Sequence, residues 1–291
     1  MTRVDLAVKE PPQFPMGTAG GRGQRAARPR NTASSQAGRT FLGAGTVLAV
    51  LAVWELLART GTFPPGSIPP ATAVLAEFFH QLAVGGFWLA VWNTVSVAML
   101  GLLLIVLIAS PLALLVGLVR PVRESTWFVL EFLKPIPPVA LIPLGLLLWG
   151  PSPGMKLFLI VMGAVWPLLT QLIYGLKEVN GISADMARSY RLGWWLTTSR
   201  LIAPSILPFA LTGLRISASI SVVIAVVTEM IGGAAGLGQN IVVAQSAGAL
   251  SEMYALILAA GLLGLLINAG FRSAQKPLMF WHPSMRQEGN L

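Results

Sequence analysis

Residues 91–119 read VWNTVSVAMLGLLLIVLIASPLALLVGLV, and this run contains no charged side chain. About 20 mostly apolar residues are enough for a helix to cross the hydrocarbon core of a membrane. The run exceeds that length, so a helix formed by it has room to tilt or to extend beyond the bilayer. The stretch therefore predicts a membrane-spanning helix.

The composition of the whole chain agrees with that prediction. Of the 291 residues, 55% are hydrophobic and only 11% are charged, and the mean hydropathy is +0.72. An average soluble domain is about one-quarter charged. We therefore expect an all-α integral membrane protein with about six transmembrane helices. Their expected positions are 41–58, 91–119, 127–149, 155–176, 208–231 and 253–271.

The two ends of the chain differ from the apolar middle. Residues 1–40 are polar and rich in Gly, Pro and Arg, as in GTAGGRGQRAARPRNTASSQAGR at 17–39. Such a segment buries too little apolar surface to fold alone, so we expect a disordered basic tail there. The expected organisation is this tail, a transmembrane domain at 41–275 and a second tail at 276–291.

The positive charges predict the orientation in the membrane. The formal net charge is +9 and the pI is about 10.8. In a soluble protein this excess would favour nucleic acid as a partner, but membrane proteins concentrate Lys and Arg in cytoplasmic segments. With the amino terminus inside, all 20 Lys and Arg residues except Arg59 and Lys156 fall on the inner side. We expect both termini in the cytoplasm, the lipid bilayer as a partner and no nucleic acid.

Several kinds of site are not expected. The chain has no cysteine, and His80 and His282 lie far apart, so neither a disulfide nor a metal site is expected. No G-x-x-x-x-G-K-[ST] motif occurs, so this chain is not expected to bind ATP or to be an enzyme, and no catalytic residue or cofactor is assigned. The sequence GLGQN at 236–240 is expected to be an extracytoplasmic turn after the fifth helix.

The longest inward loop contains residues 183–208, SADMARSYRLGWWLTTSRLIAPSILP. Apolar residues three and four apart predict one helix with an apolar stripe, which Pro204 and Pro208 would end. On amphipathicity alone, a helix on the membrane surface, with Trp194 and Trp195 at the headgroups, is favoured over a helix that docks to a partner protein. The loop is longer than a tight helix connection needs.

The residue order in this loop resembles the EAA loop of binding-protein-dependent ABC importer permeases. The pattern Glu-Ala-Ala, three residues, Gly, nine residues, Ile, one residue, Leu-Pro matches without gaps at 185–187, Arg191, Leu201 and 203–204. Asp185 keeps the carboxylate of the first position. Arg191 replaces the glycine, and this departure leaves the geometry of the turn as a question for the structure.

Other motifs resemble the nitrate, sulfonate and taurine group of these permeases, and the similarity runs from about 45 to 275. They are P..LP....GLR from Pro204 to Arg215, PIPPVALIPLGLLLWG at 135–150, TEMIGGAAGLGQNI at 228–241 and WELL at 54–57. The resemblance implies the type I ABC importer permease architecture in a bacterial plasma (inner) membrane. It also implies a small anion such as a sulfonate, taurine or nitrate as the substrate, although related permeases transport vitamin precursors.

The resemblance implies partners as well. They are a second permease copy in a homodimer, an extracytoplasmic solute-binding protein and two ATP-binding subunits, which would hold the ATP and Mg. In such permeases the loop forms a coupling helix that contacts the ATP-binding subunit. The residues that this assigns to docking are Asp185, Ala187, Arg188, Tyr190, Arg191, Leu201 and Pro204.

Polar and helix-breaking residues in the membrane segments are candidates for the pathway or gate. Pro138 and Pro143 break the third segment, and the freed backbone groups must face protein or a water-filled path. Ser217 and Ser221 either line the path or pack helices, and packing is the commoner use. Glu229 lies toward the outer end of the fifth helix, where structural hydrogen bonds or contact with the binding protein are favoured over substrate contact.

Two other classes of membrane protein remain open. A secondary transporter or channel needs no docking loop, and internal repeats or more intramembrane charges would be expected in one. A membrane anchor or assembly subunit would explain the helices but not the ordered spacing in the loop.

Overall fold

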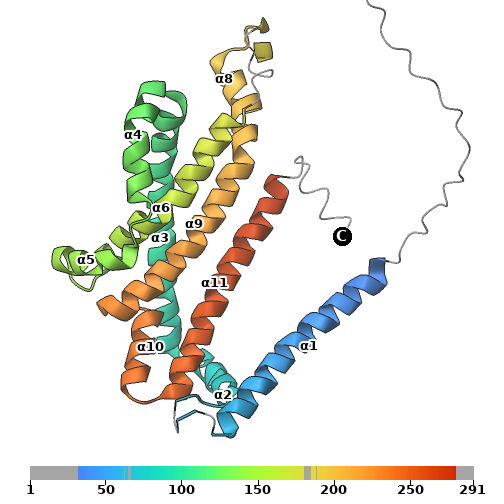
Figure 1. Ribbon diagram of the computed structural model, residues 1–291, viewed down its shortest axis with the longest axis vertical. Helices are drawn as coiled ribbons and strands as arrows, with labels where there is room; N and C mark the ends of the chain where they lie inside the picture. The colour runs from blue at the N-terminus through green and yellow to red at the C-terminus, as the bar shows by residue number, and fades with distance from the viewer. Residues whose placement is uncertain (1–31, 62, 65–66, 180–184, 188, 280–291) are drawn as a thin grey trace, which may run out of the picture. The chain divides into compact units, whose positions relative to one another are not determined.

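The computed structural model describes residues 32–61, 63–64, 67–179, 185–187 and 189–279, and the chain divides into two units, 1–45 and 46–291. All regular elements of the described residues are helical, which confirms the predicted all-α class (Figure 1). The elements are α1 (Thr32–Arg59), α2 (Ala71–Leu82), α3 (Gly85–Leu118), α4 (Arg120–Leu133), η1 (Pro138–Leu141), α5 (Ile142–Trp149), α6 (Pro153–Lys177), α8 (Trp194–Thr197), η2 (Thr198–Ile202), α9 (Ala203–Gly232), α10 (Leu237–Ser246) and α11 (Leu250–Leu278).

Five stretches of the described residues are long and apolar enough to cross a membrane, and a sixth span results if α4 and η1–α5 count together. The five are Leu42–Arg59, Gly85–Leu118, Pro153–Lys177, Trp194–Ser246 and Leu250–Gln275. The chain bends by 83° between α4 and the η1–α5 pair, within the proline-rich segment. Prolines lack the N–H that continues a helix, so the break follows from the sequence.

Several elements differ from the predicted ones. Helix α1 begins at Thr32, so the predicted tail at 1–40 overlaps the start of this helix. Helices α2 and α10 were not predicted, because each is too short to give a membrane-spanning signal. Helix α9 begins at Ala203 and contains Pro208, so the predicted start of the fifth helix at residue 208 is wrong.

Helices α3, α6 and α9 form the core of the second unit. Their buried side chains make one apolar cluster, and small residues let the backbones approach closely. A Cβ atom at Gly163 of α6 would overlap Pro138 and Ile224, and one at Gly213 of α9 would lie 3.0 Å from the Cα of Leu168. The absence of a side chain at these glycines lets α9 and η1 pack closely against α6.

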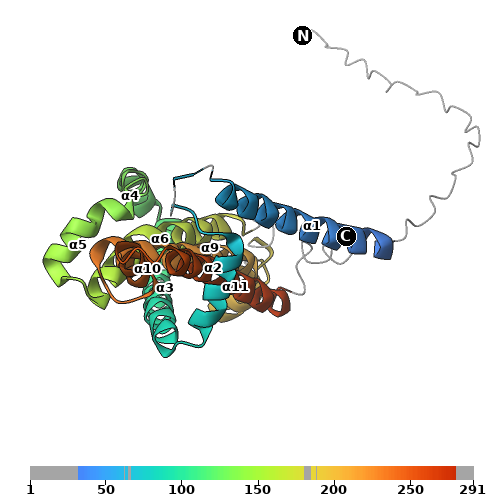
Figure 2. The same cartoon turned by 90° about the horizontal axis from the view of Figure 1, so that it is seen from below.

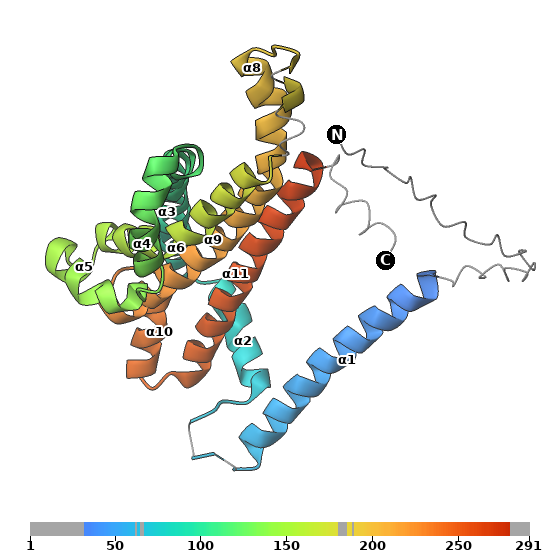
Figure 3. The same cartoon turned by 45° about the horizontal axis from the view of Figure 1, so that its top comes forward.

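Two regions at opposite ends of α9 follow from this packing. Helices α6 and α9 lie side by side, and the segment with α8 joins them at one end (Figures 1 and 3). At the other end of α9, α10 folds back against α9 and α11. Helices α4 and α5 lie on one side of the core and α11 on the other (Figure 2). The loop and Glu229 lie at these two ends.

Candidate functional site

The loop between α6 and α9 contains a helical turn, a tight turn and a second helix. Residues 185–187 are helical, the chain turns at 190–193, and α8 then leads through η2 into α9. The prediction of one continuous helical stripe through this segment is therefore wrong. The physical reason lies in the backbone at Arg191.

Arg191 has a φ of +50°, and among the described residues no other non-glycine residue has a positive φ. The amide of Leu192 donates to the carbonyl of Ala187 at 2.9 Å, and the amide of Tyr190 donates to the carbonyl of Met186 at 2.9 Å. This is the hydrogen-bond pattern of a helix that ends at a left-handed residue, where glycine is usual. Arg191 thus adopts the left-handed conformation that glycine adopts most easily, and the turn is kept.

The second half of the loop is continuous with α9. The amide of Ala203 donates to the carbonyl of Thr198, five residues back, which makes Thr198–Ile202 a π-helical turn. A π turn has a wider backbone, so it accommodates Pro204, which lacks an N–H and clashes with the carbonyl four residues back in a regular helix. The prediction that Pro204 and Pro208 end the helix is therefore wrong.

The loop exposes large apolar side chains. Tyr190 is 74% exposed, Trp194 77% and Trp195 72%. Ala187 is buried, and it lines a shallow hollow of about 280 Å³ with Tyr190, Leu201 and others. Of the remaining residues assigned to docking, Asp185 and Arg191 are exposed, Leu201 and Pro204 are half-buried, and Arg188 lies outside the described residues.

A buried ion pair lies toward the other end of the core. Nζ of Lys156, in the first turn of α6, is 2.9 Å from Oε1 of Glu229, near the end of α9, and both side chains are at most 2% exposed. Lys156 Nζ also donates to the carbonyls of Asn93 at 3.2 Å and Ala235 at 2.9 Å. All three protons of the ammonium group therefore have acceptors.

The second carboxylate oxygen of Glu229 is also fully used. Oε2 accepts hydrogen bonds from Oγ1 of Thr94 at 2.9 Å and from the amide of Gly238 at 3.0 Å. The amide of Leu237 donates to Oγ1 of Thr94 at 3.0 Å. The first amides of a helix lack partners inside the helix, and here α3 and α9 supply them for α10. We call Lys156, Glu229, Thr94 and these two amides the buried network.

Two glycines make room for the buried network. A Cβ atom at Gly236, whose φ is +157°, would overlap the carboxylate of Glu229, and one at Gly238 would overlap the carbonyl of Val226. The GLGQN segment was predicted to be a turn. It is instead the start of α10, and its glycines allow Glu229 to approach the helix terminus.

Lys156 was not among the predicted site residues and was expected only as one of two outer positive charges. The available signal was a lysine at the start of an apolar helix, since ionisable residues within membrane segments are functional candidates. Nothing in the sequence pairs it with Glu229, 73 positions away. For Glu229, the structure shows the structural hydrogen bonds that the sequence analysis favoured, while its role in a gate stays a prediction.

The other pathway candidates lie in different surroundings. Ser217 and Ser221 are fully buried on α9, and the hydroxyl of Ser221 donates to the carbonyl of Ser217 at 2.8 Å. Ser217 Oγ has no hydrogen-bond partner in the described part of the chain. Pro138 is half-buried against α6, and Pro143 is exposed in the first turn of α5. Their assignment to a pathway stays a prediction.

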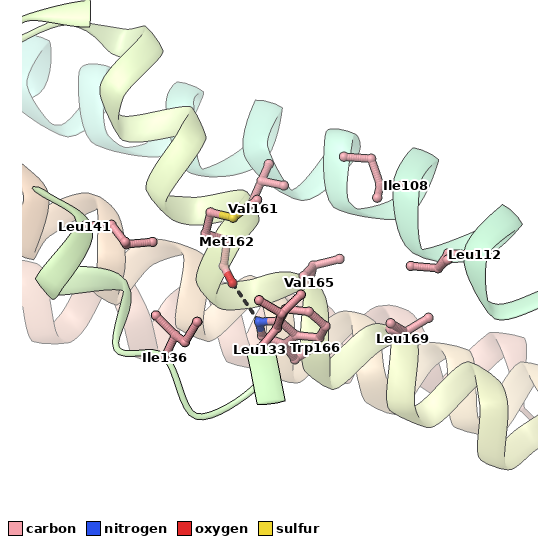
Figure 4. Close-up of a pocket in the computed structure, with 10 residues that line it drawn as sticks. All are labelled: Ile108, Leu112, Leu133, Ile136, Leu141, Val161, Met162, Val165, Trp166 and Leu169. Carbon is pink, nitrogen blue, oxygen red and sulfur yellow. Dashed lines mark hydrogen bonds between the residues drawn. The ribbon is translucent and has the colours of Figure 1, made fainter. Parts of the chain in front are cut away.

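An apolar cavity of about 220 Å³ lies between α3, α6 and the segment that joins α4 to α5 (Figure 4). Apolar side chains line it, and the indole of Trp166 donates to the carbonyl of Met162 at 2.7 Å. It lacks the donors that a small anion needs. The lining residues are Ile108, Leu112, Leu133, Ile136, Leu141, Val161, Met162, Val165, Trp166 and Leu169.

Known proteins resemble the chain over most of its length. Residues 105–278 match the family model of the binding-protein-dependent transport system inner membrane component. The taurine transport system permease protein TauC of Escherichia coli K12 is 29% identical over 249 residues, which cover 83% of this chain and 90% of that protein. The nitrate import permease protein NrtB of Leptolyngbya laminosa is 26% identical over 226 residues, covering 76% and 81%.

The fold also has a solved counterpart. A chain of the MetNI methionine ABC transporter superposes with a TM-score of 0.55 at 16% identity, over 65% of this chain and 94% of that chain. At this identity the likeness shows a shared fold.

Proposed function

The chain belongs to the family of binding-protein-dependent transport system inner membrane components, and on that premise we propose that its loop from Asp185 to Pro204 docks cytoplasmic ATP-binding subunits. The chain is a multi-pass membrane protein and a permease subunit of the ABC importer type. Family membership implies ATP-binding subunits and a solute-binding protein as partners. The finer proposals concern how this chain meets them.

The exposed turn supports the docking proposal most directly. Tyr190, Trp194 and Trp195 are each more than 70% exposed on a segment held by a defined backbone turn. Large aromatic side chains on a helix are typical anchors for a groove in a partner protein. The hollow beside Ala187 accepts a side chain of the partner in return.

The continuity of the loop with α9 supports a mechanism of coupling. Helix α8, the π turn and α9 follow one another without a break from Trp194 to Gly232. A displacement imposed on the loop is therefore transmitted along α9 as a rigid element. It arrives at Glu229, which holds α10 to the core, so movement of the loop is coupled to the opposite end of the bundle.

The proposed complex has further parts. Two copies of this chain form a homodimer with the pathway between them, and an extracytoplasmic binding protein delivers the solute. ATP and Mg bind to the partner subunits, and this chain, which lacks a phosphate-binding motif, is not an enzyme. The complex lies in the bacterial inner membrane with both chain termini in the cytoplasm, in line with the distribution of Lys and Arg.

The proposed substrate is a small anion, such as a sulfonate, taurine or nitrate. Relatives named for taurine and nitrate support this class. The carboxylate of Glu229 would repel an anion, but the ion pair with Lys156 neutralises it. The buried network is therefore compatible with passage of an anion nearby.

Co-purification tests the docking proposal. The chain is expressed with a candidate ATP-binding subunit from the same organism, and the amount of that subunit retained in detergent is measured. We expect Asp185→Lys and Trp194→Ala to reduce the retained ATPase severalfold. Phe79→Ala is the matched control, because Phe79 is an exposed aromatic residue (65%) on α2, away from the loop. If the loop variants retain the ATPase as well as the control does, the docking proposal fails.

A further inference from the structure

A second pocket lies between α4 and the ends of α3 and α6 that are nearest the loop. Its volume is about 170 Å³, and three cationic side chains and one carboxylate line it. These four are Arg123, Lys134, Lys177 and Glu131, and the other lining residues are Val116, Trp127, Leu130, Leu169, Thr170, Ile173 and Tyr174. We call this the cationic pocket. Its charge favours an anionic ligand.

The cations of the pocket are not fully neutralised. Lys134 Nζ is 2.6 Å from Oε1 of Glu131, which is the only carboxylate of the pocket lining. Nε of Arg123 donates to the carbonyl of Val116 at 3.1 Å, and this guanidinium also contacts the carbonyl of Gly117, so it is held at the end of α3. Lys177 has no ion-pair or hydrogen-bond partner in the parts of the chain that the structure describes.

The cationic pocket adjoins the apolar cavity of Figure 4. Leu169 lines both. Along α3 the lining passes from Ile108 and Leu112 in the cavity to Val116 in the pocket, and along α6 it passes from Leu169, which lines both, to Lys177 in the pocket. The two hollows adjoin along α3 and α6, and we call them together the groove: cationic side chains line one part and apolar side chains line the other. A molecule that fits it has an anionic head and an apolar chain.

The exposed surface of α4 suits the headgroup region of a membrane. No residue of α4 is buried, and Trp127, Phe128 and Phe132 are each more than 60% exposed. Trp127 and Tyr174 stand at the cationic pocket, and amphipathic aromatic rings favour the membrane–water interface. Basic pockets between helices on the cytoplasmic side suit anionic headgroups.

We propose that this groove binds one anionic phospholipid, with its headgroup phosphate in the cationic pocket and an acyl chain along the apolar cavity. The bound lipid packs between α4 and the α3–α6 pair beside the start of the loop. The loop is expected on the cytoplasmic side, so the lipid would belong to the cytoplasmic leaflet. That assignment rests on the proposed function. Binding itself requires only the groove.

Native mass spectrometry of the full chain in detergent tests the inference. The probes are dioleoyl phosphatidylglycerol, dioleoyl phosphatidylcholine, dihexanoyl phosphatidylglycerol and inorganic phosphate. We expect dioleoyl phosphatidylglycerol to be retained more strongly than each of the others, because it alone offers both the negative charge and the long chains. Equal retention of phosphatidylcholine would overturn the inference that the site selects an anionic headgroup. Equal retention of the short-chain lipid, or of phosphate, would overturn the acyl-chain site.

A charge variant locates the site. Lys134→Gln with Lys177→Gln is expected to weaken retention of dioleoyl phosphatidylglycerol about 30-fold. Arg120→Gln is the control, since Arg120 is a cation of α4 outside the pocket, and retention there is expected to stay unchanged. Unchanged retention in the double variant overturns the site. If that variant does not fold, the lipid comparison on the unaltered chain still decides. Loss of lipid without loss of the ATPase separates this inference from the docking proposal.

Discussion

The side chains near the two ends of α9 differ in burial and in pairing. In the buried network, Lys156 and Glu229 are at most 2% exposed, and each polar atom has a partner within the chain. In the loop, Tyr190, Trp194 and Trp195 project with more than 70% of their surface exposed. The first end is complete by itself, while the second offers apolar surface that a partner would cover. Substitutions at the two ends should therefore change different properties.

The largest expected effect is on stability, at the buried network. Glu229→Gln leaves Lys156 charged and buried without a counter-ion, and such a break typically costs about 3–5 kcal/mol. The free energy of unfolding is measured in mixed micelles, with Glu124→Gln as the control. Glu124 pairs with Arg120 on the exposed surface of α4, where an ion pair contributes about 0–1 kcal/mol.

A double substitution sharpens this result. Replacing both charges, as in Lys156→Met with Glu229→Leu, removes the unpaired charge and should recover part of the lost stability. The amide of Gly238 then loses its acceptor, and Thr94, which accepts from the amide of Leu237, loses its bond to Glu229. Recovery of the stability should therefore be incomplete. A Glu229→Gln protein as stable as Glu124→Gln would contradict the importance of the buried network.

The next effect concerns the glycines of the same region. Gly238→Ala places a Cβ atom against the carbonyl of Val226, and overpacking of this kind costs about 1–3 kcal/mol. Gly261→Ala on α11 is the control, because the added Cβ would meet no atom within 4 Å apart from the adjoining backbone of α11 itself. The control should be neutral or slightly stabilising, since alanine favours helix over glycine. Equal thermal midpoints for the two variants would show that α10 is not held as described.

The smallest effect on stability is expected at the turn of the loop. Arg191→Gly relieves the cost of a left-handed backbone at a residue with a side chain, about 1 kcal/mol. Arg191→Val should do the reverse, because β-branched residues tolerate this conformation poorly. Hydrogen exchange of the Leu192 amide, which is bonded to Ala187, reports on the turn. We expect the Leu192 amide to exchange more slowly in the glycine variant and faster in the valine variant. The opposite order would contradict a left-handed backbone at Arg191.

The sequence predicted the fold better than the buried network. Long apolar runs report directly on membrane spans, so the helices α3, α6, α9 and α11 were predicted with their ends within seven residues of the observed ones. The network depends on contacts between residues far apart in the chain, such as Thr94 and Glu229, which are 135 positions apart. No local pattern encodes such a pairing.

The loop shows a second limit of sequence reasoning. Its apolar spacing predicted one helix, but the left-handed residue divides that helix, and only the matching glycine of the EAA pattern gave a hint of it. The π turn that accommodates Pro204 also has no sequence signal, because the backbone ahead of a proline can widen instead of ending the helix.

Cross-linking tests the central claim, that the loop docks the ATP-binding subunit, most directly. Because the chain contains no cysteine, Tyr190→Cys and Trp194→Cys each introduce a single thiol on the exposed face of the loop. The complex is purified with its ATP-binding subunit and treated with a short thiol–amine cross-linker, with Phe79→Cys as the control. We expect a covalent adduct with the ATP-binding subunit from both loop variants and none from the control. Absence of the adduct from both loop variants in an intact complex would contradict the claim.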